Sequence, residues 1–404
     1  MRAVAVGEMS VNIIAPPLRP HVLRQVSGPR TRRSRKGRVQ GRVCAPNSRQ
    51  SLVALASTVQ DDRIPSWDAL AELLPAPSER VLQDTVLNPS FPDIPEGRIV
   101  LFRDRNGWCP YCERVWLGLL AKGLDFDEVL IELQGRKPGW YYDISNGSTP
   151  AVRWEDGSMQ GESLDILRAL DEKYPDTLPL FPPGQDAAAD ALIGAFRRVM
   201  PQGCRPSART AFIFHGGGRP APRADFERTL DGVEALLEEH RSGPFFLGDA
   251  FSAVDCAWAP FLERYNVQLP LLHAGLRVRD PSARPRLAAW FEAMETRVPA
   301  YPSRVQGTPY TWAAVLATAG YGNAGRAMEF RPPREVLPSS AGAEEWVRFA
   351  SGREGVGATP QEEAALRMFR NREAIVKDTV SNCGSLSRDD EALVHTALRA
   401  CVAA

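Results

Sequence analysis

The residues of this chain best suited to chemistry are Cys109 and Cys112, which stand in a Cys-Pro-Tyr-Cys run. The run follows an apolar segment at 99–102, which is typical of a strand, and opens an amphipathic segment, which is typical of a helix. A helix N-terminus offers unpaired N–H groups and partial positive charge, both of which favour a thiolate on the first cysteine. Two cysteines at this spacing between a strand and a helix therefore predict a redox-active pair.

The two cysteines should play different roles. We expect Cys109 to be the exposed nucleophile, with the nearby basic side chains of Arg103 and Arg105 adding to the positive field around it. Pro110 suits the first helical turn, because an N–H group there would have no helical partner. Cys112 lies one turn further into the helix and should be more buried, which suits a resolving or a structural role.

Two other interpretations of the cysteine pair are a zinc site and a static disulfide. Zinc needs about four ligands, and the sequence has no second Cys-x-x-Cys and no His-x-x-x-His to complete a site. No metal is therefore expected. A disulfide framework needs further cysteines at regular spacing, whereas the others are scattered singly. They are Cys44, Cys204, Cys256, Cys383 and Cys401.

An ordered series of signals follows the predicted helix. A second apolar segment covers 126–133, and a basic and aromatic loop covers 136–141. A Thr-Pro pair at 149–150 then opens a short strand, and an Asp-Gly pair at 156–157 predicts a hairpin turn. A Glu-Ser pair at 162–163 leads into another helix. The predicted order is strand, helix, strand, loop, strand, hairpin and helix.

This order resembles the thioredoxin-like domain of glutathione transferases, combined with the active-site motif of a glutaredoxin. The resemblance implies that Pro150 follows a cis peptide bond and that the backbone of Thr149 pairs with the cysteinyl part of glutathione. It assigns the γ-glutamyl group of glutathione to Glu162 and Ser163. A residue at a helix start, such as Ser163, offers backbone N–H groups to a carboxylate.

The same resemblance completes the predicted glutathione site with three further residues. Arg136 or Lys137, in the basic loop, should meet the glycyl carboxylate of glutathione. Trp108, directly before the first cysteine, is also assigned to the glutathione site.

The resemblance extends into an all-helical second domain and covers about 97–315. Ser252 and Asp255 match the capping box inside that domain. In such a box the Ser252 side chain accepts a hydrogen bond from a backbone N–H of the first helical turn, and the Asp255 side chain accepts one from the Ser252 backbone N–H. The motif at 109–112, the loop at 137–141 and the run at 260–265 are most similar to the iota class, which occurs in cyanobacteria, algae and non-vascular plants.

The fold class expected is an α/β thioredoxin-like domain followed by an all-α glutathione-transferase domain, with a disordered presequence and a helical C-terminal extension. At 404 residues the chain is much longer than two such domains, so further segments must flank them. A short helix before the first domain should pack on it, and Thr359 should begin a helix of the extension. The expected parts are a transit peptide at 1–60, a linker with a short helix at 61–96, the thioredoxin-like domain at 97–182, the helical domain at 185–330 and the linker with the helical extension at 331–404.

The first 60 residues carry charge of one sign, although the whole chain has a formal net charge of zero. They hold many arginines and Lys36 against a single acid, Glu8. Such a composition is typical of an organelle transit peptide, so we expect a chloroplast protein, with the mitochondrion or the cytoplasm as alternatives. A basic arm for nucleic acid is a weaker interpretation. Because the basic segment has no interleaved aromatic residues and no nucleic-acid-binding fold is recognised, nucleic acid is not an expected partner. No apolar run approaches the roughly 18 residues that span a membrane, so a membrane is not an expected partner either.

The resemblance, together with the cysteine at the reactive position, implies a glutathione-dependent thiol–disulfide oxidoreductase that works through a mixed disulfide at Cys109. Thioltransfer, deglutathionylation and dehydroascorbate reduction are the expected reactions, and glutathione is the co-substrate. Expected partners are small disulfide or hydrophobic substrates and glutathionylated proteins, and the resemblance allows a homodimer. Two alternatives stay open. One is a transferase that conjugates electrophiles to glutathione, and the other is a non-catalytic carrier of hydrophobic ligands.

Overall fold

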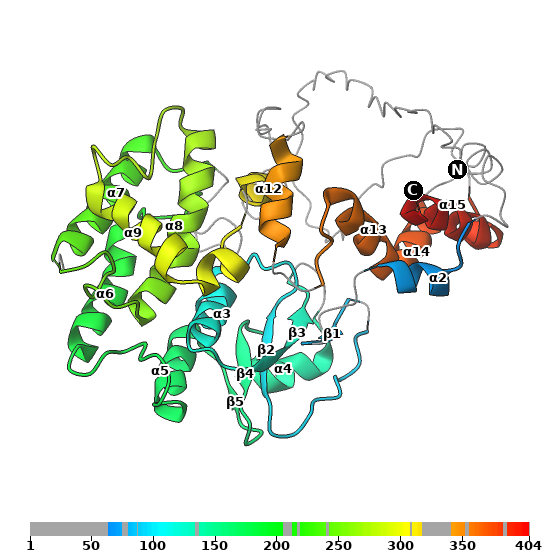
Figure 1. The fold of residues 1–404 in the computed structure, drawn as a ribbon, viewed down its shortest axis with the longest axis horizontal. Helices are drawn as coiled ribbons and strands as arrows, with labels where there is room; N and C mark the ends of the chain where they lie inside the picture. Colours follow the sequence, from blue (N-terminus) through cyan, green and yellow to red (C-terminus); the bar gives the residue numbers. More distant parts are fainter. Residues whose placement is uncertain are drawn as a thin grey trace, which may run out of the picture. The chain divides into compact units, whose positions relative to one another are not determined.

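The computed structural model describes most of the chain from residue 64 onward. The predicted presequence at 1–60, together with Arg136 and Cys383, lies outside the described residues. The described ranges are 64–74, 80–86, 88–133, 137–204, 212–215, 219–239, 242–307, 309–316, 341–351, 355–382 and 386–403. They form a thioredoxin-like α/β domain, an all-helical domain and a helical C-terminal segment, which confirms the predicted fold class (Figure 1).

A five-stranded sheet lies at the centre of the first domain, with the strand order β1-β3-β2-β4-β5. The strands β1 and β2 run parallel to β3, whereas β4 runs antiparallel to both β2 and β5. All six residues of β2 are buried, because the strand is central and has helices on both faces. The strands are β1 (Val81–Asp84), β2 (Ile99–Asp104), β3 (Phe126–Ile131), β4 (Ala151–Arg153) and β5 (Met159–Gln160).

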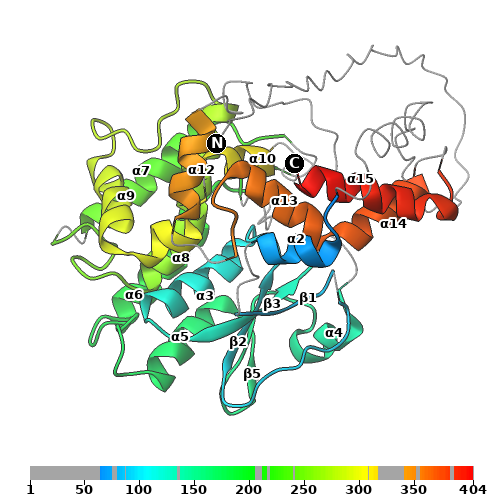
Figure 2. The same ribbon diagram turned by 45° about the vertical axis from the view of Figure 1, so that its right-hand side comes forward.

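Helices cover both faces of this sheet (Figure 2). On one face, α3 (Pro110–Ala121) and α5 (Ser163–Lys173) pack against each other and share one core with the inward side chains of β2. On the other face, α4 (Gly139–Ser145) places Tyr141 against Phe102 of β2, with ring centroids 6.0 Å apart. Successive side chains of β2 point alternately into the two cores, which fixes the orientation of the strand. The helix α3 follows this strand, so the cysteine pair lies at the end of the sheet.

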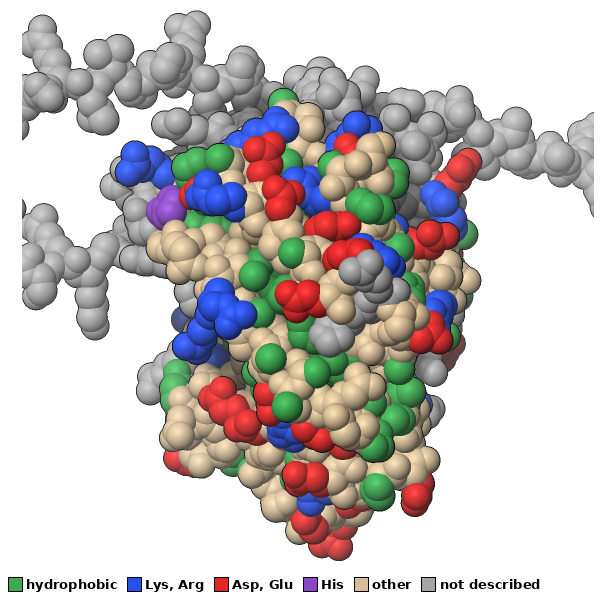
Figure 3. Space-filling view, turned by 90° about the vertical axis from the view of Figure 1, so that its left-hand side faces the viewer, with side chains coloured by type: hydrophobic (Ala, Val, Ile, Leu, Met, Phe, Trp, Pro, Cys, Tyr) green, Lys and Arg blue, Asp and Glu red, His purple; other side chains and the backbone are tan. Residues whose placement is uncertain are grey.

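The helical domain is built around α8 (Ala253–Leu272), which is buried along most of its length. Its predicted capping box is confirmed, because Asp255 accepts a hydrogen bond from the Ser252 backbone N–H at 2.9 Å and Ser252 Oγ accepts one from Val254. Acidic and basic side chains are interspersed on the face shown in Figure 3. The other elements of the domain are α6 (Asp186–Val199), α7 (Arg223–Glu239), α9 (Pro285–Arg297), a π-helical turn η2 (Tyr301–Val305) and α10 (Pro309–Val315).

The C-terminal segment is helical, as predicted. Thr359 caps the second of its helices, since its Oγ1 accepts a hydrogen bond from the Glu362 N–H at 3.1 Å. The segment comprises α12 (Ala341–Ala350), α13 (Pro360–Arg370), α14 (Arg372–Asn382), a 3₁₀ turn η5 (Arg388–Asp390) and α15 (Glu391–Ala403).

The short N-terminal helix α2 (Trp67–Leu73) packs on this C-terminal segment, so the prediction that it packs on the thioredoxin-like domain is wrong. Trp67 meets the ring of Phe369 edge-on, with centroids 5.8 Å apart, and its Nε1 donates to His395 Nδ1 at 3.3 Å. The physical reason is that the amphipathic C-terminal helices leave an apolar cluster, and the indole ring covers part of it.

Strand β1 lies inside the segment that the sequence predicts to be a linker. It extends the sheet beyond β3, which would otherwise be an edge strand. Its sequence, Val-Leu-Gln-Asp, lacks the alternation of apolar and polar residues that identifies a half-buried strand in a sequence. In the structure all four residues are half-buried.

Candidate active site

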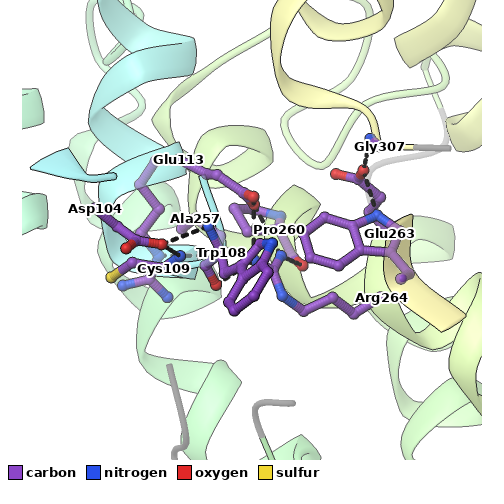
Figure 4. Close-up of polar contacts among 11 residues, drawn as sticks. Asp104, Trp108, Cys109, Glu113, Ala257, Pro260, Glu263, Arg264 and Gly307 are labelled. Carbon is purple, nitrogen blue, oxygen red and sulfur yellow. Dashed lines mark hydrogen bonds and ion pairs between the residues drawn. The ribbon is translucent and has the colours of Figure 1, made fainter. Parts of the chain in front are cut away.

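The cysteine motif lies where β2 ends and α3 begins, as predicted, and Cys109 is the N-cap residue of α3. The loop between the two elements is held by Asp104, the last residue of β2. Its Oδ2 accepts hydrogen bonds from the N–H groups of Trp108 at 2.6 Å and of Cys109 at 3.1 Å (Figure 4). Asp104 was not among the predicted site residues, although an acidic residue at the end of the strand that leads to the motif is a signal for this role.

Both cysteines of the motif are buried, so the prediction that Cys109 is the exposed one is wrong. Cys109 is 2% exposed and Cys112 is 1% exposed. The reason is that α3 packs between the sheet and α8 of the helical domain. On the remaining side, Cys109 Sγ lies 4.0 Å from the carbonyl oxygen of Thr149.

The two thiols differ in their acidity. The pKa of Cys109 is lowered, first by a hydrogen bond from the Cys112 thiol and also by the N–H groups of Cys112 and Tyr111, against the opposing effect of burial. The pKa of Cys112 is raised well above its ordinary value, first by burial and then by the proton it donates to Cys109. The direction for Cys109 agrees with the sequence prediction.

The arginines that the sequence places near the thiolate are engaged elsewhere. Arg103 forms a two-point ion pair with Glu128, at 2.8 and 2.9 Å, and Arg105 pairs with Asp84 at 2.6 Å. Each guanidinium charge is therefore compensated by a carboxylate, and the prediction that Arg103 and Arg105 stabilise the Cys109 thiolate is not supported. Hydrogen bonds from Cys112 and Tyr111, at the start of α3, stabilise this thiolate instead.

Of the predicted glutathione residues, Thr149 is in contact with Cys109, and Glu162 and Ser163 lie at the start of α5. The peptide bond before Pro150 is cis, as the resemblance implies, and Thr149 is brought to the cysteine sulfur. Ser163 is the buried first residue of α5. Glu162 precedes it, is exposed and has a φ of 59°, a left-handed conformation that is uncommon for a residue with a side chain.

Lys137 is the basic residue of the predicted pair that the structure describes. Its Nζ donates to the carbonyl oxygen of Gly147 and lies 5.7 Å from the centre of the Tyr141 ring. Burial lowers the pKa of Lys137, while Cys112 and Cys109 act in the opposite direction. The contacts with Gly147 and Tyr141 hold the Lys137 side chain against the segment that precedes Thr149.

A buried ion pair joins α3 to α8 directly beneath the motif. Arg264 bonds the carboxylate of Glu113 at 2.8 and 3.0 Å, and the same guanidinium donates to the carbonyl oxygen of Trp108 at 2.8 Å (Figure 4). Burial raises the pKa of Glu113 to about 7 in spite of its arginine partner. The sequence does not predict this ion pair, because its two residues lie far apart in the chain.

Trp108 itself packs toward the helical domain, where Trp312 and Val315 form a small apolar cluster with it. Glu263 of α8 fixes this cluster by accepting a hydrogen bond from Trp312 Nε1 at 2.7 Å and another from the Gly307 N–H. The residue before the nucleophile is thus anchored on both its backbone and its side chain.

The described part of the chain lacks a metal-binding cluster and a membrane-spanning helix. No group of three or more His, Cys, Asp or Glu residues there is placed to hold a metal ion. Among the helices of that same part, none combines the length and the apolar character needed to cross a membrane.

Two family models match the chain over the regions just described. The model for the glutathione S-transferase N-terminal domain matches residues 108–173, and the model for the C-terminal domain matches residues 219–293. The first match contains the cysteine motif and the Thr-Pro and Glu-Ser pairs. The second contains the capping box and α8.

Three plant relatives are similar to this chain. Glutathione S-transferase L1 from Arabidopsis thaliana is 31% identical over 47% of this chain and 76% of its own length. The chloroplastic glutathione S-transferase L2 from the same plant is 32% identical, over 48% of this chain and 62% of the relative. Glutathione S-transferase DHAR2, also from Arabidopsis thaliana, is 32% identical over 42% of this chain and 72% of its own length.

Proposed function

Since this chain belongs to the glutathione S-transferase family, we propose that it is a glutathione-dependent thiol–disulfide oxidoreductase that acts through a mixed disulfide at Cys109. The observation that carries the proposal is the position of Cys109 at the N-cap of α3, with its sulfur 4.0 Å from the carbonyl oxygen of Thr149, the residue before the cis peptide bond to Pro150. The lowered pKa of the thiol supports it. A hydroxyl group at this place could only stabilise the thiolate of glutathione, whereas a thiolate can itself attack a disulfide.

The proposed reaction has two steps. The Cys109 thiolate attacks the glutathione sulfur of a glutathionylated substrate, the substrate's S–S bond breaks, and the substrate leaves as a thiolate that takes up a proton. A second glutathione, as its thiolate, then attacks the glutathione sulfur of the mixed disulfide. Oxidised glutathione forms and the Cys109 thiolate leaves, which its lowered pKa favours.

Glutathione binding is assigned to the loops around the cysteine. We propose that the backbone of Thr149 pairs with the cysteinyl part of glutathione, that Glu162 meets its α-ammonium and that the N–H of Ser163 meets its α-carboxylate. Lys137 is proposed for the glycyl carboxylate. Its hydrogen bond to Gly147, two residues before Thr149, supports this loop as one wall of the site.

The motif also supports a narrower assignment. The Cys-Pro-Tyr-Cys run, with the loop at 137–141, favours a cysteine-type member of the iota class. Substrates of the proposed enzyme are small disulfides, glutathionylated proteins and dehydroascorbate.

An assay of glutathione-dependent reduction of hydroxyethyl disulfide tests the reaction. We expect Cys109→Ser to abolish activity and Cys112→Ser to retain much of it, because a glutathione-using enzyme needs only one thiol of the pair. Cys401→Ser, at an exposed cysteine of the C-terminal segment, is the matched control and should be unchanged. Equal loss in both motif variants would replace this mechanism by a dithiol one. Conjugation of a chlorinated aromatic that survives Cys109→Ser would favour a conjugating transferase instead.

We propose further that the thioredoxin-like domain includes β1 and extends to 182, and that the helical domain begins at 185. We also propose that residues 1–60 direct import into a plastid. The arginine excess of the segment supports this, and one relative carries the description chloroplastic. A fluorescent fusion of residues 1–60 should accumulate in chloroplasts. A fusion that stays in the cytosol would contradict the proposal.

A further inference from the structure

A cavity of about 520 Å³ lies beside the loop that precedes the cysteine motif, since Arg105, Asn106 and Gly107 are among its lining residues. The thioredoxin-like sheet, the end of the helical domain and the helices α12 and α13 of the C-terminal segment all contribute to its wall. None of the described residues proposed for catalysis or glutathione binding lines it. Its volume is within the range of roughly 300–1,000 Å³ that is typical of sites for small organic ligands.

Three tryptophans from three different helices supply the apolar part of this wall: Trp116 from α3, Trp312 from α10 and Trp346 from α12. Leu82 and Val356 add aliphatic surface. Arg103 covers one face of Trp116, 4.3 Å from the ring centre, and Arg264 covers one face of Trp312, at 4.1 Å. Indole rings in a cavity of this size suit a flat aromatic group, which can pack against the ring edges and the faces that the arginines leave uncovered.

The charged part of the wall contains four arginines and three carboxylates among the described residues. Three of the arginines are each bound to one carboxylate, so these pairs contribute no net charge. The pairs are Arg103–Glu128 at 2.8 Å, Arg105–Asp84 at 2.6 Å and Arg367–Glu363 at 2.5 Å.

Arg370 is the arginine that remains. Its Nη1 donates to the carbonyl oxygen of Gly355 at 3.1 Å, but its Nη2 is buried and has no hydrogen-bond partner among the described residues. Burial lowers the pKa of Arg370, with Glu363 acting in the opposite direction, in keeping with a side chain that is partly removed from solvent. A buried donor without an acceptor is costly, so an anion at this point would be stabilised by both charge and hydrogen bonding.

We propose that this cavity binds a small organic monoanion, with an aromatic body against the tryptophans and a carboxylate or sulfonate on Arg370. One negative charge is expected because the four arginines of the described wall exceed its three carboxylates by one. Since β1, α12 and α13 all lie outside the ranges matched by the two family models, the site belongs to the flanking segments as much as to the transferase domains.

The test uses the full chain and the fluorescent probe 8-anilinonaphthalene-1-sulfonate, an aromatic monoanion. Binding is measured by calorimetry and by energy transfer from tryptophan, in the presence of saturating glutathione. N-phenyl-1-naphthylamine, which has the same aromatic body without the sulfonate, is the neutral comparison. We expect the wild-type chain to bind the anion at least tenfold more tightly than the neutral probe.

Arg370→Gln should weaken binding of the anion by about tenfold or more and leave the neutral probe unaffected, because one charge-assisted contact is lost. Arg370→Lys should restore part of the difference. Arg388→Gln, at an exposed arginine of the same segment, is the matched control. Val356→Phe fills the cavity without changing charge and should weaken binding of both probes. Thermal unfolding of each variant checks that it is folded.

Anion binding that is unchanged in both Arg370→Gln and Val356→Phe would overturn the proposal, as would displacement of the probe by S-hexylglutathione, which would place it in the active site. Disulfide reduction by Arg370→Gln should equal that of the wild type. An inactive wild-type enzyme that still shows the Arg370-dependent binding would contradict the proposed function alone.

Discussion

The Cys112 thiol donates a hydrogen bond to the sulfur of Cys109 and is the largest single cause of the lowered pKa there. The second cysteine therefore has a function even in a mechanism that never forms an internal disulfide. It stabilises the thiolate of the first, together with the N–H groups at the start of α3. Since both sulfurs are buried, acidity and not exposure separates their roles.

We predict that Cys112→Ala raises the pKa of Cys109, because the main hydrogen bond to its thiolate is lost, and that Cys112→Ser raises it less. The acid limb of the activity profile should move to higher pH in Cys112→Ala, since the thiolate then forms only at higher pH. Thiolate absorbance against pH, measured on a Cys401→Ser background, gives the midpoint directly. An unchanged midpoint in Cys112→Ala would show that the helix start alone sets this pKa.

Glu162 is the second residue whose role can be tested alone. Glu162→Ala should weaken glutathione binding by roughly ten- to hundredfold, because a hydrogen bond between charged groups is lost. Glu172→Ala, at an exposed position on the same helix α5, is the matched control and should bind normally. Calorimetry on a Cys109→Ser background measures the affinity without turnover. Normal affinity in Glu162→Ala would mean that the site is misplaced.

Among the elements, α3 is the one on which the two domains meet. Its first turn is tied to β2 through Asp104, and its buried face is tied to α8 through the Glu113–Arg264 pair. Arg114 adds a hydrogen bond from its Nε to the carbonyl oxygen of Ala257 at 3.1 Å. The position of the reactive thiol is thus set by the helical domain as well as by the sheet.

We predict that Arg264→Met lowers the free energy of unfolding by about 3–5 kcal/mol, because it leaves the Glu113 carboxylate buried without its partner. The matched control is Arg297→Met, since Arg297 forms an exposed ion pair with Asp249, and it should cost about 1 kcal/mol or less. Denaturant unfolding measures both. The double variant Glu113→Leu, Arg264→Met should recover much of the loss, and a double variant as unstable as the single one would show that the pair is not the cause.

The features that could be predicted from the sequence are those that local chemistry dictates. The capping boxes, the cysteine motif at a helix start and the Thr-Pro turn each depend on residues only a few positions apart. The Glu113–Arg264 pair joins residues 151 positions apart, so it follows from packing and leaves no local pattern. Strand β1 was missed for a related reason, because its half-buried residues acquire a strand conformation only by pairing with β3.

At the scale of the whole molecule, the segments that flank the two domains pack on each other. Trp67 of α2 joins the apolar cluster formed by α14 and α15, and the carbonyl oxygen of Pro65 accepts a hydrogen bond from Arg399 at 3.2 Å. The cavity proposed for an organic anion also depends on this segment, through α12 and α13.

We predict that Trp67→Ala loosens the C-terminal segment and leaves disulfide reduction unchanged, because the indole packs on that segment and not on the active site. Amide hydrogen exchange in 360–403 should become faster. Leu73→Ala is the matched control, since Leu73 lies on the same helix and is 76% exposed. Unchanged exchange in Trp67→Ala would show that α2 adds no stability to the segment.

The contact between Trp67 and His395 has a consequence for how the protein is made. The two residues are 328 positions apart, and a ribosome adds about 5–20 residues per second. The thioredoxin-like and helical domains, whose contacts lie between these positions, can therefore complete their cores during translation. Helix α2 leaves the ribosome first but acquires its packing partners only after both domains have been synthesised, so its indole ring stays exposed to solvent or to a chaperone until then.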